Sequence, residues 1–248
     1  MKNNSLYVGN PYLDQQIFFR NLCRKNSLPI SQQQLDRLES FQSLLLSWNK
    51  NINLISRQDE NNIWQRHLLG SVSFLFKFQL QEKTEMLDVG TGGGLPGIPL
   101  AILLPDMKIT LIDSIRKKAD AVRKIVETLK LENVMVDCGR AEELAKQRQY
   151  AQRFDYVISR AVAPLKNLIM WCKPFMRIAL PDGDNHKTQQ ENKMFIPRGS
   201  MLMLKGGDMT REMDEAVKKC KPKNLAVFPL SIISVEDLFD KKLVVVQP

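Results

Sequence analysis

The chain has 248 residues, of which 44% are hydrophobic and 25% charged, and its net charge is +9. This length can bury a substantial core and predicts one large domain, or one domain with a small appendage. The sequence contains no apolar run of membrane-spanning length and no apolar signal segment, so we expect a cytoplasmic protein that does not engage a membrane.

Few side chains suit metal chemistry or a histidine-based nucleophile. The chain has only two histidines, and its four cysteines are far apart with no C-x-x-C pair. We therefore expect no zinc site, no disulfide framework and no histidine triad, while a magnesium ion held by carboxylates stays open.

The first eighty residues show helical spacing of apolar side chains. The pattern predicts helices over residues 13–26, over Ser31–Trp48 with Ser31 as the N-cap, and over residues 61–78. His67 falls on the apolar side of the third helix, where we expect it to be a core histidine whose hydrogen bonds are satisfied. Residues 1–83 are thus predicted to form an all-helical extension.

From residue 84 onward, short β-rich runs alternate with helical stretches. Helices are expected notably over residues 115–129 and 163–176. The predicted strands cover residues 86–89, 108–113, 134–137, 156–161, 200–206 and 242–247. This alternation is typical of an α/β fold, and we expect residues 84–248 to form a doubly wound parallel sheet. The polar stretch 177–198 has no sustained period and is predicted to be an exposed insertion.

A glycine-rich loop follows the first predicted strand, in the stretch MLDVGTGGGLPGIPLA. Five of the twelve glycines fall within residues 90–97, as expected where a backbone needs positive φ angles or must approach a ligand closely. A tight strand-to-helix connection without a ligand is the alternative. In a doubly wound sheet this loop lies at the ligand-binding edge.

The loop fits two kinds of ligand. Residues 92–97 spell G-x-G-x-x-G, the pattern of dinucleotide-binding loops, but Asp88 and the Gly90-x-Gly92 pair place the glycines in a different register after the strand. A carboxylate at Asp88 suits a cationic or hydroxyl-rich ligand better than a pyrophosphate. No Lys-Ser or Lys-Thr closes a phosphate loop, so we favour S-adenosylmethionine and keep a nicotinamide cofactor as the alternative.

Three further strand ends carry candidate groups. Asp113 ends the second predicted strand, where it could accept the ribose hydroxyls or simply cap the next helix. After the third strand, the backbone amides of Ala141 and Glu142 could meet an adenine edge or belong to an ordinary helix start. Arg160 follows the fourth strand at the same edge.

Several motifs together resemble one known family. In order and spacing, the chain is similar to the bacterial small-subunit ribosomal RNA guanine-N7 methyltransferases, also called glucose-inhibited division protein B. The resemblance covers residues 35–176 and resumes near Ser200. It is carried by the segments FQSLLLSWNKNINLIS, RHLLGS, LDVGTGGGLPGIPLAI, GRAEE, FDYVISRAVAPL and MLMLKG. The 177–198 segment is longer than is usual in the family, and the C-terminal strand matches only loosely.

The resemblance implies a Rossmann-like class I methyltransferase fold that takes S-adenosylmethionine as cofactor and methylates N7 of a guanine in 16S ribosomal RNA. It implies that the cofactor binds at the positions that match the family's motifs, which are Gly90, Leu95, Ala141, Glu142 and Arg160. We add Asp113 to these positions because its carboxylate could accept the ribose hydroxyls.

Guanine N7 carries a free lone pair, so the predicted reaction needs no general base and depends on positioning. We therefore expect no catalytic acid or base, and we take Arg140 and Lys117 as candidates for contacts with RNA phosphates. The expected enzyme is a monomer that binds 16S ribosomal RNA or the small ribosomal subunit. A nicotinamide-dependent oxidoreductase and a non-catalytic RNA-binding ribosome-assembly protein remain the alternatives.

Overall fold

The structure is a computed structural model that describes residues 12–160, 163–177, 192–230 and 240–248. A seven-stranded sheet forms its centre, with the strand order β4-β3-β2-β5-β7-β9-β8. The strands are β2 (Glu85–Val89), β3 (Lys108–Asp113), β4 (Val134–Cys138), β5 (Tyr156–Arg160), β7 (Ser200–Gly206), β8 (Asn224–Pro229) and β9 (Lys241–Gln247). In the described part of the chain, no helix combines the length and apolar character needed to cross a membrane.

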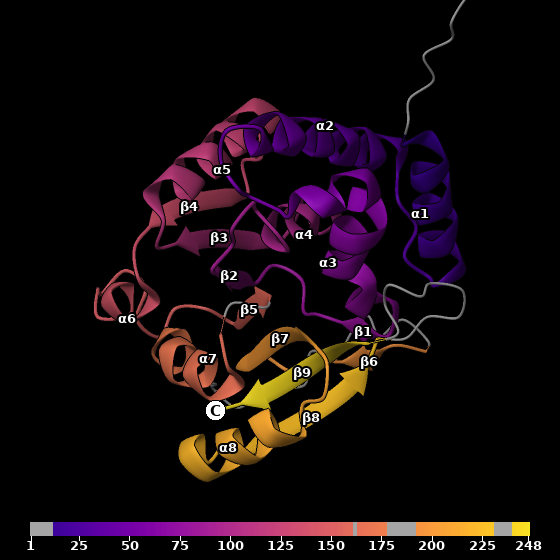
Figure 1. The fold of residues 1–248 in the computed structure, drawn as a ribbon. Helices are drawn as coiled ribbons and strands as arrows, with labels where there is room; N and C mark the ends of the chain where they lie inside the picture. Colours follow the sequence, from indigo (N-terminus) through magenta and orange to yellow (C-terminus); the bar gives the residue numbers. More distant parts are fainter. Residues whose placement is uncertain (1–11, 161–162, 178–191, 231–239) are drawn as a thin grey trace, which may run out of the picture.

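Helices cover both faces of this sheet, which confirms the predicted doubly wound α/β fold (Figure 1). One face carries α4 (Gly97–Leu103) and α5 (Arg116–Leu129). The other carries α6 (Ala141–Leu144), α7 (Leu165–Cys172) with the short 3₁₀ turn η4 (Lys173–Phe175), and α8 (Thr210–Cys220). Successive strand residues face opposite cores, so Met86 packs with the first group of helices and Leu87 with the second.

The expectation of a parallel sheet is correct for β4, β3, β2, β5 and β7 but wrong for β9, which runs antiparallel to both β7 and β8. The apolar run that predicts β9 specifies a strand, whereas its direction depends on the connection that precedes it. The sequence patterns do not predict strand β8.

The N-terminal helices pack on the same face as α4 and α5. They are α1 (Leu13–Lys25) and α2 (Gln32–Asn49), which lie along the outside of that layer in Figure 1. Ser31 caps α2 as predicted: its Oγ accepts from Gln34 N at 3.2 Å, while Gln34 Oε1 accepts from Ser31 N at 3.0 Å. One apolar core is continuous from these helices into the sheet, and the division at residues 83 and 84 stays a proposal about organisation.

The third predicted helix is helical but irregular. It consists of η1 (Arg57–Asn62), a π-helical turn η2 (Trp64–Leu69), α3 (Gly70–Val72) and a 3₁₀ turn η3 (Ser73–Phe76). Trp64 is fully buried and donates its indole N–H to Gln42 Oε1 at 2.7 Å, which ties this segment to α2. Turns of the π type are rare and are found mostly at functional sites.

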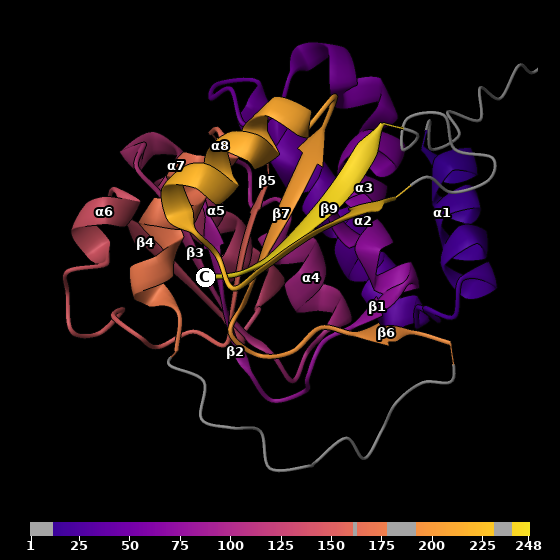
Figure 2. The same ribbon diagram turned by 90° about the horizontal axis from the view of Figure 1, so that it is seen from below.

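A second, two-stranded sheet corrects two expectations. Strand β1 (Phe78–Gln79) interrupts the region predicted as all-helical, and it pairs in parallel with β6 (Met194–Phe195), apart from the main sheet (Figure 2). Ile196, which follows β6, is 2% exposed and accepts a hydrogen bond from Tyr156 Oη. The end of the 177–198 stretch is therefore not an exposed insertion; residues 178–191 lie outside the described residues.

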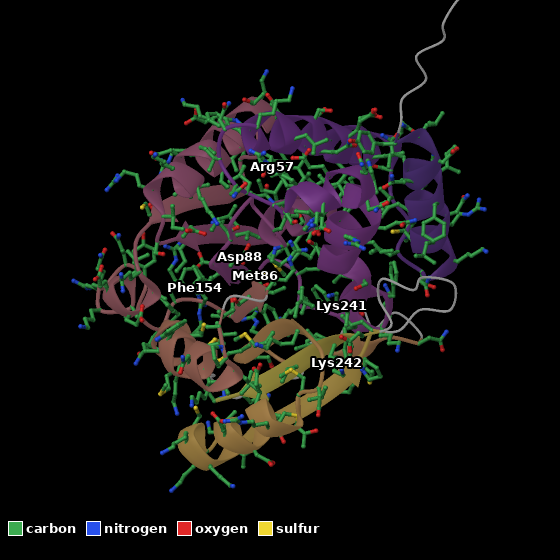
Figure 3. The ribbon with its side chains drawn as sticks, viewed as in Figure 1. Arg57, Met86, Asp88, Phe154, Lys241 and Lys242 are labelled. Carbon is green, nitrogen blue, oxygen red and sulfur yellow. The ribbon has the colours of Figure 1, made fainter. Side chains whose placement is uncertain are left out.

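Asp88 connects β2 to α4 from inside the protein. Its side chain is fully buried, and its Oδ2 accepts from Thr91 Oγ1 at 2.7 Å and from Gly97 N at 3.0 Å. Figure 3 labels it at the centre of the molecule. Asp88 thus holds the two ends of the glycine loop from behind, and the expectation that its carboxylate suits a ligand is wrong.

Burial raises the pKa of Asp88 to about 7, although the bonds from Thr91 and Gly97 and the charge of Arg160 act in the opposite direction. An unfolded aspartate titrates near ~3.9. Between these values the unfolded chain gives up its proton first, so the free energy of unfolding should fall as the pH rises from about 4 to about 7.

We expect Asp88→Asn to remove this dependence, because an amide oxygen can still accept both hydrogen bonds and does not titrate. The loss of unfolding free energy between pH 4 and 8 should shrink by up to about 4 kcal/mol, as estimated from the linkage of pKa and stability. Urea unfolding at several pH values measures this loss. Asp120→Asn, on the exposed side of α5, is the matched control, and an equal slope in wild type and Asp88→Asn would contradict the assignment.

Candidate functional site

A cavity of about 380 Å³ opens beyond the carboxyl ends of β2 and β3. Strand β2 lies between β3 and β5, so this is the point where the strand order reverses and where doubly wound sheets bind ligands. We call it the glycine-loop cavity. The residues that line it are Leu54, Gly90, Thr91, Gly92, Gly93, Leu95, Asp113, Ser114, Ile115, Lys118 and Arg160.

The glycines of the loop serve different purposes. Gly90 and Gly92 have φ angles of 72° and 57°, which side-chain-bearing residues rarely adopt, and both line the cavity. A Cβ at Gly93 would lie 2.8 Å from Leu45 Cδ1, so this glycine lets α2 approach the loop. A Cβ at Gly97 would collide with Leu111 and with Asp88. The loop is therefore both a ligand-facing surface and a tight connection.

Asp113 combines the two roles that its position suggests. Its Oδ2 accepts from Gly92 N at 2.9 Å and its Oδ1 accepts from Ile115 N at 2.8 Å, so the carboxylate links the glycine loop to the start of α5. It also lines the cavity. Because a carboxylate offers about four acceptor positions, capacity remains for a hydroxyl-bearing ligand.

Arg160 stands at the carboxyl end of β5, and its side chain reaches toward the N-terminal helical region. Its Nη2 lies 3.0 Å from His67 Nδ1, and its Nη1 donates to the carbonyl oxygen of His67 at 3.4 Å. Burial lowers the pKa of Arg160 to about 10, while Asp88 and Asp59 raise it, so the guanidinium stays charged at neutral pH.

His67 is largely buried, as expected, and both of its ring nitrogens face polar partners. Its Nε2 lies 3.2 Å from Asp59 Oδ2, opposite the nitrogen that faces Arg160. Burial, then the charge of Arg160, lowers the pKa of His67 to about 4, so the ring is neutral. Since Nδ1 must accept from Arg160, we assign the proton to Nε2, facing Asp59.

The structure brings together four of the six predicted cofactor residues, since Gly90, Leu95, Asp113 and Arg160 line one cavity. Ala141 and Glu142 form the first turn of α6 after β4, and neither lines that cavity.

The two candidates for RNA contact are also outside the cavity. Arg140 precedes α6 and is exposed. Lys117 lies on α5 beside a separate hollow that Trp48 and Ile52 also line. Its neighbour Lys118 does reach the glycine-loop cavity.

Leu54 is a cavity residue that the motif analysis did not single out. It comes from the loop after α2, and buried Asn49 holds that loop: Asn49 Oδ1 accepts from Leu54 N at 2.8 Å and from Ile55 N at 2.9 Å, and its Nδ2 donates to Glu60. In the sequence, the feature that could indicate this loop is Asn49 itself, a polar residue at the end of an apolar helix face. The N-terminal region therefore supplies part of the cavity wall.

A second cavity, of about 460 Å³, lies beyond the ends of β5 and β7, and Arg160 lines it too. We call it the basic cavity. The residues that line it are Asp59, Arg66, His67, Gly70, Arg160, Leu204, Lys205, Gly206, Leu230, Lys241 and Lys242. Within the described ranges, no three His, Cys, Asp or Glu side chains gather as a metal site would require.

Comparison with known proteins gives one consistent family. Residues 34–179 match the family model described as rRNA small subunit methyltransferase G. Proteins of that name from Flavobacterium psychrophilum and Christiangramia forsetii are 36% and 34% identical to this chain; the alignments cover 87% and 92% of this chain and 91% and 96% of theirs.

The crystal structure of a predicted O-methyltransferase from Agrobacterium tumefaciens shares the fold. Its TM-score is 0.50 at 15% identity, with 73% of this chain and 79% of that chain covered. The architecture is that of a class I methyltransferase.

We expect the His67 ring to stay neutral in the folded protein well below the usual histidine range, because burial and Arg160 disfavour its charged form. NMR titration of the ring signals should show no change between pH 8 and pH 5.5, where an ordinary histidine titrates near ~6.5. The spectrum of His67→Gln identifies the signal among two histidines. Arg160→Met should raise the pKa of His67, and a normal titration in the wild type would contradict the assigned contacts.

Proposed function

The chain belongs to the rRNA small subunit methyltransferase G family, and we propose that it transfers a methyl group from S-adenosylmethionine to N7 of a guanine in small-subunit (16S) ribosomal RNA. The single observation that carries this proposal is the glycine-loop cavity at the switch point of the sheet, inside the segment that matches the family. The net charge of +9 suits a polyanionic partner.

The residues of the glycine-loop cavity fit S-adenosylmethionine. The cofactor supplies a methyl group on a positively charged sulfur and has no phosphate. Asp113 offers acceptor positions for ribose hydroxyls, and Ile115, an apolar side chain that is 50% exposed at the cavity, offers a surface for the adenine ring. Gly90 and Gly92 present bare backbone.

Several contacts follow from this fit as part of the proposal. Lys118 and Arg160 supply positive charge for the carboxylate of the amino-acid portion. The amides of Ala141 and Glu142 lie in the first turn of a helix, where backbone N–H groups have no helical acceptor, and we assign them to the adenine edge.

Methyl transfer to N7 requires positioning and no proton transfer. The lone pair of N7 forms the new N–C bond while the S–C bond breaks and its electrons stay on sulfur, so the positive charge moves to the guanine ring. His67 is neutral, with a pKa near 4, and no titration of this ring occurs near neutrality to activate the acceptor. The chain's contribution is to hold the two reactants about 3–3.5 Å apart in line.

The proposal extends to the setting of the reaction. We propose, as expected from the sequence, a monomer that acts in the cytoplasm on 16S ribosomal RNA or the small ribosomal subunit. We keep Arg140 and Lys117 as RNA-contact residues and 84–248 as the methyltransferase domain with 1–83 as its helical extension.

The decisive experiment supplies purified protein with labelled S-adenosylmethionine and small subunits from cells lacking the gene, followed by nuclease digestion and mass spectrometry. We expect one N7-methylguanosine per subunit. The single-turnover rate should vary by less than about threefold from pH 6 to 9, because an essential base titrating there would impose a tenfold rise per unit. The absence of methylated guanine would contradict the proposal. So would a single-turnover rate that rises tenfold per pH unit in the folded enzyme, as an essential base would require.

Ile115→Ser should weaken S-adenosylmethionine binding about tenfold, since the adenine loses an apolar surface worth roughly 1–2 kcal/mol. Calorimetric titration measures the affinity. Val217→Ser, which removes an equally exposed apolar side chain from α8, is the matched control and should leave the affinity unchanged. If Ile115→Ser and the wild type bind S-adenosylmethionine with equal affinity, the adenine ring does not pack against Ile115.

A further inference from the structure

We propose that the basic cavity receives the guanine nucleotide that is methylated, and that Gly70 leaves the room for it. This inference rests on the proposed function and assigns the acceptor to particular residues. The cavity is separate from the glycine-loop cavity, and its other walls come from η1, η2, β7 and β9.

The position of the basic cavity suits an acceptor. Arg160 lines both cavities, so a group in one is a single side chain away from a group in the other. Both open beyond the carboxyl ends of neighbouring parallel strands, β2 and β5–β7. A methyl donor and its acceptor must meet at such a shared boundary.

The charge of the basic cavity suits a phosphate-bearing ligand. Among the described residues that line it, five are cationic and one, Asp59, is acidic. Three of these cations have acidic partners: Arg66 pairs with Asp59 at 2.6 Å, Lys205 pairs with Glu212 at 2.9 Å, and Lys242 pairs with Asp240 at 3.4 Å.

Lys241 and Lys242 stand at the start of β9, labelled in Figure 3, and supply the charge at the rim. Lys241 is exposed, and Lys242 Nζ is 3.4 Å from Asp240 Oδ1. We assign these two lysines to the phosphates that flank the target base.

Inside the cavity, the contacts of Arg160 keep N7 available. Arginine readily donates to O6 and N7 of guanine, and a donor on N7 would occupy the lone pair that must attack. Here two guanidinium nitrogens face the carbonyl oxygen and Nδ1 of His67, and Asp59 lies behind the ring. His67 is thereby a positioning residue that holds the guanidinium of Arg160 against the wall of the basic cavity.

Gly70 makes the opening. Its φ of −59° is helical, so a side chain there meets no backbone strain, and an added Cβ would have Arg160 Nη1, at 4.0 Å, as its near neighbour. Any longer side chain would extend into the basic cavity, which Gly70 lines. About 460 Å³ accommodates one nucleotide and not a duplex, so the target base must be unpaired or turned out of its helix.

Substitution of Gly70 tests the assignment. Gly70→Leu should lower single-turnover methylation of small subunits by about 100-fold, as expected when the acceptor is displaced. The affinity for S-adenosylmethionine should stay within about twofold, because Gly70 lines the basic cavity and does not line the glycine-loop cavity. Gly70→Ala is the matched control for the backbone; it should melt no earlier than wild type, because alanine favours a helix, and lose much less activity.

Substitution of Lys241 and Lys242 tests their assignment to the flanking phosphates. Lys241→Ala/Lys242→Ala should bind small subunits at least about tenfold more weakly, with a salt dependence reduced by about two phosphate contacts. Lys218→Ala/Lys219→Ala removes the same charge from the exposed end of α8 and should change binding less than about twofold.

The outcomes separate this inference from the function on which it rests. If the wild type methylates N7, two results would overturn the acceptor assignment alone. One is a Gly70→Leu variant that methylates at the wild-type rate, and the other is an equal loss of subunit binding in the two lysine double variants. A wild-type protein that binds no S-adenosylmethionine would overturn the proposed function. Loss of cofactor affinity in Gly70→Leu would also contradict the inference, because it would make the two cavities one site.

Discussion

The buried carboxyl of Asp88 is the constraint on which the rest of the site depends. One of its oxygens accepts from Thr91 and from Gly97, and it therefore fixes the end of β2, the glycine loop and the start of α4 relative to one another. Gly97 has no room for a Cβ because this carboxyl and Leu111 lie against it. With the loop held from behind, its other surface stays open toward Asp113 and Arg160.

Much of this arrangement follows from local sequence. The predicted strands lie within two residues of the observed ones, and Ser31 caps its helix as predicted. Gly90, Leu95, Asp113 and Arg160 could be placed at one edge because residues that end or follow adjacent parallel strands share that edge. The role of Asp88 could not be read in this way, since a carboxylate at a strand end has the same sequence signal whether it faces a ligand or the interior.

Other features depend on contacts between distant parts of the chain. The apolar neighbours of His67 on its helix indicate a buried ring, but they do not indicate its partners, Asp59 and Arg160, which come from η1 and β5. Leu54 reaches the glycine-loop cavity because Asn49 fixes its loop. The placement of Ala141 and Glu142 against the cofactor remains a prediction, as does the division into an extension and a domain.

The small sheet of β1 and β6 has a consequence for how the chain acquires its structure. Its two strands lie at residues 78–79 and 194–195, and most of the central sheet is encoded between them. Contacts this far apart in sequence carry a high entropic cost of loop closure and are made late in folding. During synthesis, the N-terminal helices leave the ribosome before the strands of the sheet on which they pack, so their apolar faces stay exposed until those strands have emerged.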